Sequence, residues 1–212
     1  MKYLHLLFFP ILIAACTSPK KPHDVTDISE PAEIYPEYYN VTVPCNIAPL
    51  NFLVRNEGVN AVHLEVGDVT LQQEGNKIIW PEADWSTLLS NHKGDTLQVT
   101  LTARVDDKWL RYPSLSWIIN HDSVDSYITY RLIEPGYEVW HEVDIEERCL
   151  ENFETRSLAN GKQLGNRCMN CHTHGGDKGQ YSYFYIRGKQ GGTIVNRNGT
   201  LSKMTLGNET TG

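Results

Sequence analysis

The sequence contains little of what several classes of protein require. Only five of its 212 residues are cysteine, so the chain is not a small scaffold held together by many disulfides. Lys and Arg number 19 against 26 Asp and Glu, the net charge is −7, and the folded region has no basic block. Because a general nucleic-acid-binding protein needs a positive surface, we expect no nucleic acid partner. No Ser-His-Asp order, paired-carboxylate motif or phosphate loop stands out, so we do not expect a self-contained enzyme.

The longest hydrophobic run lies at the N-terminus. After Met1-Lys2, residues 6–15 are almost entirely apolar, and about ten such residues predict a secretory signal over 1–15, not a membrane span. The run ends Leu12-Ile13-Ala14-Ala15-Cys16, which resembles the bacterial lipobox, so Cys16 is predicted to carry a lipid. The alternative is an ordinary signal peptide that leaves Cys16 as a free thiol.

The segment after the signal has the composition of a linker. Residues 16–36 are rich in Pro, Lys, Asp and Glu and contain few apolar residues, so we predict a flexible tether. A lipid on Cys16 would anchor the chain to the inner or outer membrane of a bacterial cell envelope. The body would then face the periplasm or the exterior, with the membrane as one partner.

Residues 37–150 predict a mainly β domain, similar to an antiparallel β-sandwich. Residues 96–105 alternate between apolar and polar side chains, as half-buried strands do. No long segment has helical periodicity, which favours the sandwich class. Tryptophans at positions 80, 85, 109, 117 and 140 are expected in the core. Other strands are predicted at 51–54, 61–66, 69–72, 77–80, 115–119, 127–133 and 139–143, with one short helix at 82–89.

Two cysteines belong to this β domain. In an oxidising compartment Cys45 and Cys149 would form one disulfide closing a long loop. The alternative is two separate buried thiols, because the sequence does not show whether their Cβ atoms approach each other.

The strongest functional signal is Cys168-Met169-Asn170-Cys171-His172, a C-x-x-C-H motif. Two thiols at this spacing bond to the two vinyl groups of one haem, and the next histidine supplies an axial nitrogen to the iron. With five Cys and eight His in the chain, chance gives roughly 0.004 such matches. We therefore predict one covalent haem c on a short irregular or helical segment at 151–180, bonded to Cys168 and Cys171, with His172 as proximal ligand.

Other uses of the same residues stay open. Cys168, Cys171, His172 and His174 also form a compact set of zinc ligands, and the two cysteines could form a redox disulfide. Met204 is a candidate for the distal haem ligand, although it lies in an alternating stretch typical of a strand. The tyrosines at 181, 183 and 185 could approach the iron or pack against the haem. Four cations flank the motif as candidate partners of the haem propionates: Lys162, Arg167, Lys178 and Arg187.

Several stretches together resemble exported Bacteroidetes lipoproteins related to TolB-like propellers and cytochromes c. The matching segments are 39–52, 130–137, 168–172, 186–188 and 191–193. The resemblance implies a β domain, one haem segment and then a β-propeller, of which 181–212 would be only the truncated start, with a terminal β-hairpin within 192–206. We expect electron transfer to a redox partner protein, for which a propeller chain encoded nearby is one candidate. The alternatives are a lipoprotein that binds a protein or glycan, its haem site structural or unloaded, and a fragment of a propeller oxidoreductase.

Overall fold

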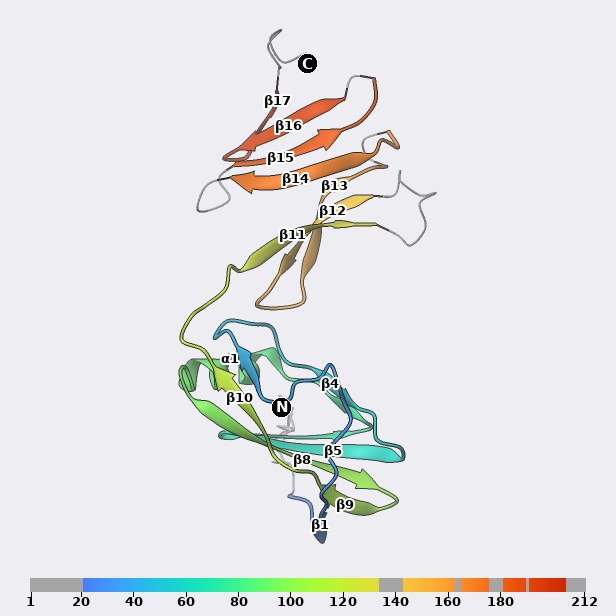
Figure 1. Ribbon diagram of the computed structural model, residues 1–212, viewed down its shortest axis with the longest axis vertical. Coiled ribbons are helices and arrows are strands. Elements are labelled where there is room, and N and C mark those ends of the chain that lie inside the picture. Colours follow the sequence, from blue (N-terminus) through green and yellow to red (C-terminus); the bar gives the residue numbers. More distant parts are fainter. Residues whose placement is uncertain (1–20, 134–142, 163–164, 176–180, 190, 205–212) are drawn as a thin grey trace, which may run out of the picture. The chain divides into compact units, whose positions relative to one another are not determined.

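A computed structural model describes residues 21–133, 143–162, 165–175, 181–189 and 191–204. These residues are mainly β, and the described part contains one helix (Figure 1). The chain divides into two compact units, each described here by itself. The first comprises Met1–Val41, Leu50–Trp80 and Thr96–Ile118, and the second comprises Thr42–Pro49, Pro81–Asp95 and Ile119–Gly212.

Two sheets contain the strands of the first unit. The larger has the strand order β1-β9-β8-β10-β3, with β5 paired to β8 and β6 paired to β5, and the smaller has the order β2-β4-β7. β1 pairs in parallel with β9, whereas β5, β6, β9 and β10 are in antiparallel pairs. The strands are β1 (Val25–Asp27), β2 (Ile34–Tyr35), β3 (Val41–Val43), β4 (Phe52–Val54), β5 (Val59–Val66), β6 (Val69–Glu74), β7 (Lys77–Ile78), β8 (Thr96–Val105), β9 (Lys108–Arg111) and β10 (Leu115–Ile119).

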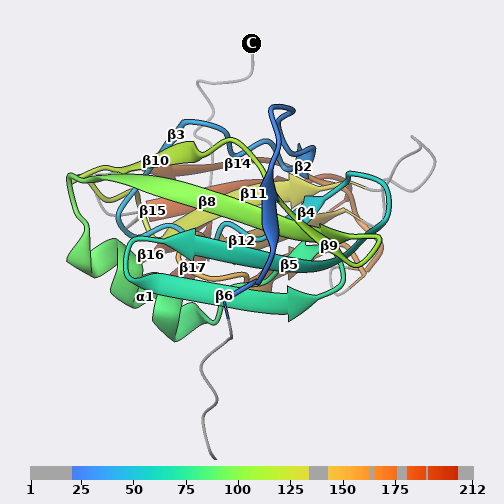
Figure 2. The ribbon, with the colours of Figure 1, turned by 90° about the horizontal axis from the view of Figure 1, so that it is seen from below.

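The flexible tether predicted over 16–36 is wrong for its described part, because β1 and β2 form there. β1 pairs with the edge strand β9, and Arg111 donates two hydrogen bonds to the Asp27 carboxylate, at 2.5 and 2.9 Å. Figure 2 shows the neighbouring strands β8, β5 and β6 of this sheet side by side. Ala32 and Ile34 are buried, so these few apolar residues obtain from tertiary packing the burial that local composition did not predict.

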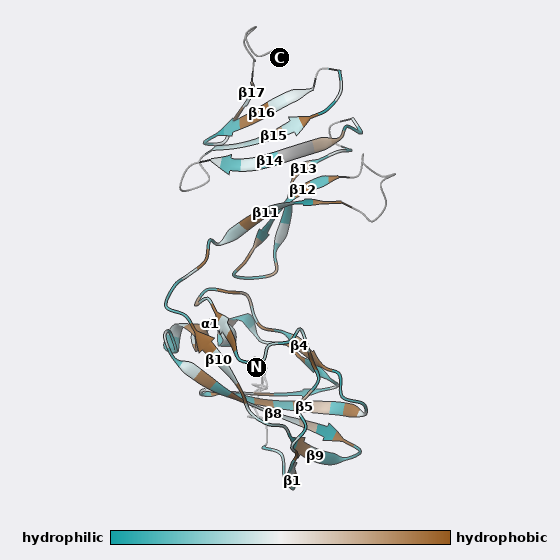
Figure 3. Ribbon diagram, viewed as in Figure 1, coloured by the Kyte–Doolittle hydropathy of each residue, from teal (hydrophilic) through white to brown (hydrophobic). Residues whose placement is uncertain are grey.

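The core of the first unit follows the predicted alternation. Four of the five apolar residues of β8, Leu97, Val99, Leu101 and Ala103, are buried. Figure 3 shows hydrophobic and hydrophilic residues alternating along β8. Trp117 is fully buried, its Nε1 donates to the Tyr38 carbonyl at 2.8 Å, and its ring lies 6.2 Å from that of Trp80. The predicted strands 96–105 and 115–119 coincide with β8 and β10.

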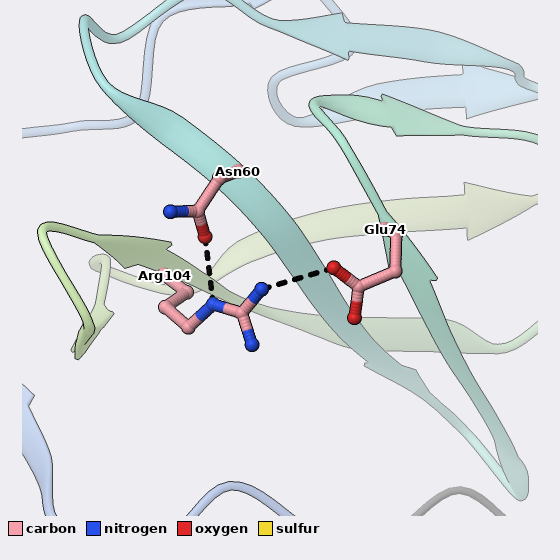
Figure 4. Close-up of polar contacts among 3 residues, drawn as sticks. All are labelled: Asn60, Glu74 and Arg104. Carbon is pink, nitrogen blue, oxygen red and sulfur yellow. Dashed lines mark hydrogen bonds and ion pairs between the residues drawn. The ribbon is translucent and has the colours of Figure 1, made fainter.

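A polar side chain also links three strands of the larger sheet (Figure 4). Arg104 of β8 donates from Nε to Asn60 Oδ1 of β5 at 2.7 Å and from Nη2 to Glu74 Oε2 of β6 at 2.9 Å. Its guanidinium carbon lies 5.6 Å from the centroid of the Trp109 ring on β9. These contacts stabilise one end of the sheet against fraying.

The second unit contains the helix and two antiparallel sheets. The predicted helix is present as α1 (Glu82–Asn91), with Trp85, Leu88 and Leu89 buried and Trp85 Nε1 donating to the Ile47 carbonyl at 2.8 Å. The sheets have the orders β11-β12-β13 and β14-β15-β16-β17. Their strands are β11 (Tyr127–Leu132), β12 (Asp144–Cys149), β13 (Thr155–Asn160), β14 (Met169–Gly175), β15 (Tyr181–Ile186), β16 (Gly192–Arg197) and β17 (Thr200–Lys203).

Strands replace the irregular or helical segment predicted over 151–180. β13 and β14 occupy most of its described residues, because β13 pairs antiparallel with β12 and β14 pairs antiparallel with β15. The predicted terminal hairpin is present as β16 and β17, turning through Asn198 (φ 50°) and Gly199 (φ 83°). Two successive residues with positive φ are typical of the tight turn that matches strand twist. The predicted strand residues 139–142, and Trp140 with them, lie outside the described residues.

Cys45 and Cys149 are both free cysteines, so the predicted disulfide between them is not formed. The Cys45 thiol donates to the His121 carbonyl at 3.4 Å, whereas Cys149 is buried at the end of β12. Hydrogen bonds link the segments that contain Cys45 and Cys149, because Glu151 accepts one from Ser126 and one from Asn46. These two bonds lower the pKa of the Glu151 carboxyl.

Candidate functional site

The C-x-x-C-H motif lies at the start of β14. The carbonyl of Cys168 accepts a hydrogen bond from the backbone N–H of Arg187 at 2.9 Å, just beyond the end of β15. Met169, the first residue of β14, is fully buried opposite Ile186. The tyrosines and β-branched residues of β15 and β16 favour strand formation, so they hold the motif segment extended.

The pairing of β14 with β15 is interrupted within the motif. Asn170 is opposite Tyr185 and Thr173 is opposite Tyr183, so the two residues between them on β14 face only Phe184. β14 therefore has one residue more than β15 at this point, which makes a β-bulge. Such bulges redirect side chains and are common beside functional sites. Cys171 and His172 are the two residues of this bulge.

A cavity of about 560 Å³ lies beside Cys168. The Cys168 thiol is half-buried and free, and its Sγ lies 3.8 Å from the Met169 carbonyl oxygen. The other lining residues are Asn166, Arg167, Arg187 and Gly188. Two arginines among the lining residues of one cavity favour an anionic group such as a carboxylate.

His172 lines a different and smaller cavity, of about 180 Å³. Its ring is half-buried, and Nε2 lies 3.3 Å from the carbonyl oxygen of Thr129 on β11. A carbonyl only accepts, so this bond requires the hydrogen of the imidazole to be on Nε2. The cavity is otherwise largely apolar, with Ile145, Leu158, Phe184 and Leu201 among its lining residues.

The donor set fits a c-type haem chemically, because a free thiol, a second cysteine and an imidazole follow one another at the required spacing. The extended backbone, however, separates Cys168 and His172 into two cavities. One porphyrin can therefore reach both side chains only if the segment leaves its pairing with β15. Iron ligation through Nε2 of His172 would likewise break the bond to Thr129.

Only some of the other predicted site residues lie beside the motif: Arg167 and Arg187 line the cavity of Cys168, and Tyr183 lines that of His172. Met204 is 52% exposed and lines a third cavity, away from that of His172. His174 is exposed and borders the cavity of His172. Lys162 is exposed, and Lys178 lies outside the described residues. No group of three or more His, Cys, Asp or Glu side chains is placed to hold a metal ion in the described part, which does not include the side chain of Cys171.

Two features of the described chain escaped the sequence reasoning. His63 is 1% exposed, and neither ring nitrogen has a hydrogen-bond partner. Glu65 Oε1 lies 3.8 Å from His63 Nε2. Burial raises the pKa of Glu65, but Lys21, followed by His63, lowers it by more, so it lies below the ordinary 4.5. The signal for the burial of His63 was the apolar character of its neighbours Ala61, Val62 and Leu64.

The second missed feature is a row of exposed aromatic side chains. Tyr181, Tyr183 and Tyr185 alternate along β15 and are each more than 40% exposed, pointing away from the side that Phe184 occupies. The alternation was visible in the sequence, but it was interpreted only in relation to the haem.

The predicted lipid attachment residue, Cys16, lies outside the described residues, as does the signal segment 1–15. In the part of the chain that is described, no helix is both long enough and apolar enough to cross a membrane. Comparison with known proteins found no matching family model, no matching curated protein and no matching solved structure.

Proposed function

We propose that this chain is a membrane-tethered haem protein of the c type that transfers electrons through one covalently bound haem. The observation that carries the proposal is the sequence Cys168-Met169-Asn170-Cys171-His172, which places two thiols and an imidazole at the spacing of haem attachment. When bound, haem supplies one-electron chemistry at its iron. The resemblance to haem-containing envelope lipoproteins belongs to the same proposal.

The residues of this chain have separate roles in holding the haem. The Cys168 and Cys171 thiols would hold the haem through two thioether bonds; addition of each S–H across one vinyl group places sulfur on one carbon and hydrogen on the other, with no net oxidation. His172 would supply an imidazole nitrogen to the iron. Arg167 and Arg187, which line the cavity beside Cys168, are the cations best placed to pair with the propionates.

Attachment requires a local change in β14. Residues 169–172 pair with β15 or form the bulge beside it. A porphyrin bonded to Cys168 and Cys171 and ligated by His172 needs these residues on one side of a compact turn. The haem-free and haem-loaded proteins should therefore differ in backbone protection at the start of β14, while the β16–β17 hairpin keeps its pairing.

The envelope location is proposed from the N-terminal sequence. A lipid on Cys16 would hold the chain on the inner or outer membrane, and the body would face the periplasm or exterior, the compartment in which c-type haem is attached. In this proposal the sheets of the first unit form a β-sandwich-like body, and electrons pass between the haem and a redox partner protein.

The test is to produce the full chain with its signal in a bacterial host, with and without a c-type haem attachment system. We expect a Soret band that survives acid-acetone extraction, and a mass increased by one haem and the lipid. Cys171→Ala should lose one thioether, and His172→Ala should alter the spectrum of the reduced protein. His174→Ala, two residues along the same strand, is the matched control and should retain both the spectrum and the covalent haem.

Other results would contradict the proposal. A lipidated chain at its bare mass, from cells whose attachment system loads another cytochrome, would exclude covalent haem. One equivalent of zinc, lost in both Cys168→Ala and His172→Ala, would favour the zinc site instead. A mass lower by two hydrogens, with Cys168 and Cys171 joined in one peptide, would favour the redox disulfide.

A second candidate function is supported by a separate observation. The exposed tyrosines of β15 are typical of a binding surface, which would suit a lipoprotein that recognises a partner outside the membrane. This candidate does not require a loaded haem site.

A further inference from the structure

We propose that the outward face of the β14–β17 sheet binds a neutral glycan chain. This face, called here the tyrosine face, consists of the side chains that alternate outward from the four strands. Its residues are Thr173 of β14, Tyr181, Tyr183 and Tyr185 of β15, Thr193, Val195 and Arg197 of β16, and Thr200 and Ser202 of β17. The inference is independent of the proposed haem.

The register across the sheet shows that these residues share one face. Residues directly opposite in antiparallel strands point to the same side. Tyr183 is opposite Thr173 on one neighbour and Val195 on the other, and Val195 is in turn opposite Ser202. The other side of β15, which includes Ser182 and Phe184, lines the apolar cavity of His172, and Thr173 and Tyr183 reach its rim. The other seven residues of the tyrosine face do not line that cavity.

The three tyrosines alternate along β15 and form a row. They are 41%, 45% and 41% exposed, so a large part of each side chain remains accessible. Alternate residues of a strand lie about 6.6–6.8 Å apart, so three rings extend over roughly 13 Å. Aromatic rings in such a row stack against the C–H faces of pyranose sugars, and a chain of linked sugars matches a row better than one monosaccharide does.

A groove beside the row supplies hydrogen-bonding groups. Its volume is about 730 Å³, within the range of small-molecule sites. It is lined by Val195, Arg197, Asn198, Thr200, Ser202 and Met204. Hydroxyl groups both donate and accept, as sugar hydroxyls do, and the Asn198 amide offers both roles as well. This mixture of aromatic rings and neutral polar groups is complementary to an uncharged polyhydroxylated ligand.

The charge of the face argues against an anionic polymer. Arg197 is the one charged residue among the nine residues of the tyrosine face, and its guanidinium lies 5.5 Å from the centroid of the Tyr181 ring. Nucleic acids and anionic lipid surfaces are bound through clusters of Lys and Arg. A single arginine engaged with a tyrosine does not provide such a cluster, so a neutral glycan is the best-matched occupant.

The test is isothermal titration calorimetry of the full chain with neutral hexasaccharides of glucose, mannose and xylose in different linkages. Tyr183→Ala removes the central ring, and we expect roughly tenfold or more weakening of binding, as for loss of one aromatic stacking contact. Tyr183→Phe keeps the ring and should bind within about threefold of wild type, since it loses only a hydroxyl. Ser182→Ala, on the opposite side of the same strand, is the matched control and should bind as wild type does.

Circular dichroism of each variant establishes whether the sheet is intact. If Tyr183→Ala does not fold, Tyr185→Ala at the end of the row takes its place with the same expected loss. The proposal is overturned if none of the hexasaccharides binds at millimolar concentration, or if a folded Tyr-to-Ala variant binds as wild type does. Saturable binding of oligothymidylate or polygalacturonate in place of the neutral sugars would also overturn it, as would self-association that buries the face.

Discussion

Replacing Arg104 with alanine tests how the large sheet of the first unit is held together. The side chain joins β8 to Asn60 of β5 at 2.7 Å and to Glu74 of β6 at 2.9 Å, and it lies over Trp109 of β9 (Figure 4). All three contacts are lost together in Arg104→Ala. Because they join separate strands, their loss should appear in the global free energy of unfolding.

The expected loss can be worked out contact by contact. The hydrogen bond to Asn60 is worth about 0.5–1.5 kcal/mol. The ion pair with Glu74 adds about 0.2–1 kcal/mol, since the Glu74 side chain is 76% exposed and the pair is screened by water. The contact with Trp109 adds roughly 0.5–1 kcal/mol. We expect Arg104→Ala to lower the free energy of unfolding by about 2 kcal/mol.

The assay is urea unfolding followed by tryptophan fluorescence, with double-mutant cycles that pair Arg104→Ala with Asn60→Ala and with Glu74→Ala. In about 1 M salt, where the Debye length is roughly 3 Å, the coupling to Glu74 should fall while the coupling to Asn60 persists. Lys108→Ala, an exposed cation on β9, is the control and should change stability by less than about 0.5 kcal/mol. An Arg104→Ala protein as stable as wild type, or a coupling to Glu74 that salt leaves unchanged, would refute this account.

Three further changes probe other parts of the fold. Leu101→Ala, at a side chain only 1% exposed, should cost about 2–5 kcal/mol in chemical denaturation, and a smaller loss would show that the core collapses around the cavity. The hydrogen bonds from Arg111 lower the pKa of Asp27 below the ordinary 3.8, so their stabilising effect is full above that value and is lost as the pH falls through the lower folded pKa. Acid titration of the unfolding midpoint should show this loss in wild type and not in Asp27→Asn. Gly94→Ala should destabilise by roughly 1 kcal/mol or more in thermal unfolding, because φ is +87° and a Cβ would overlap the ring of His121; an unchanged melting temperature would contradict this.

Much of the first unit could be predicted because strand alternation is a local property. In β8 the apolar residues recur at every second position, and burial on one face follows directly from that pattern. The helix α1 was predicted to within two residues for a similar reason, since its buried residues Trp85, Leu88 and Leu89 have helical spacing. The haem motif is also local, because covalent attachment depends on residues that follow one another in the chain.

Only the tertiary structure could show which distant segments meet. β1 is a three-residue strand in a polar stretch, and it forms because the edge of β9 and the guanidinium of Arg111 lie beside it. The separation of Cys168 and His172 into two cavities depends on the register of β14 against β15 and on Thr129 of β11. Local sequence determines which backbone conformations and bonding chemistries are available. Pairing between strands far apart in the chain determines which of them is adopted, because each pairing gains hydrogen bonds and burial only when its partner is present.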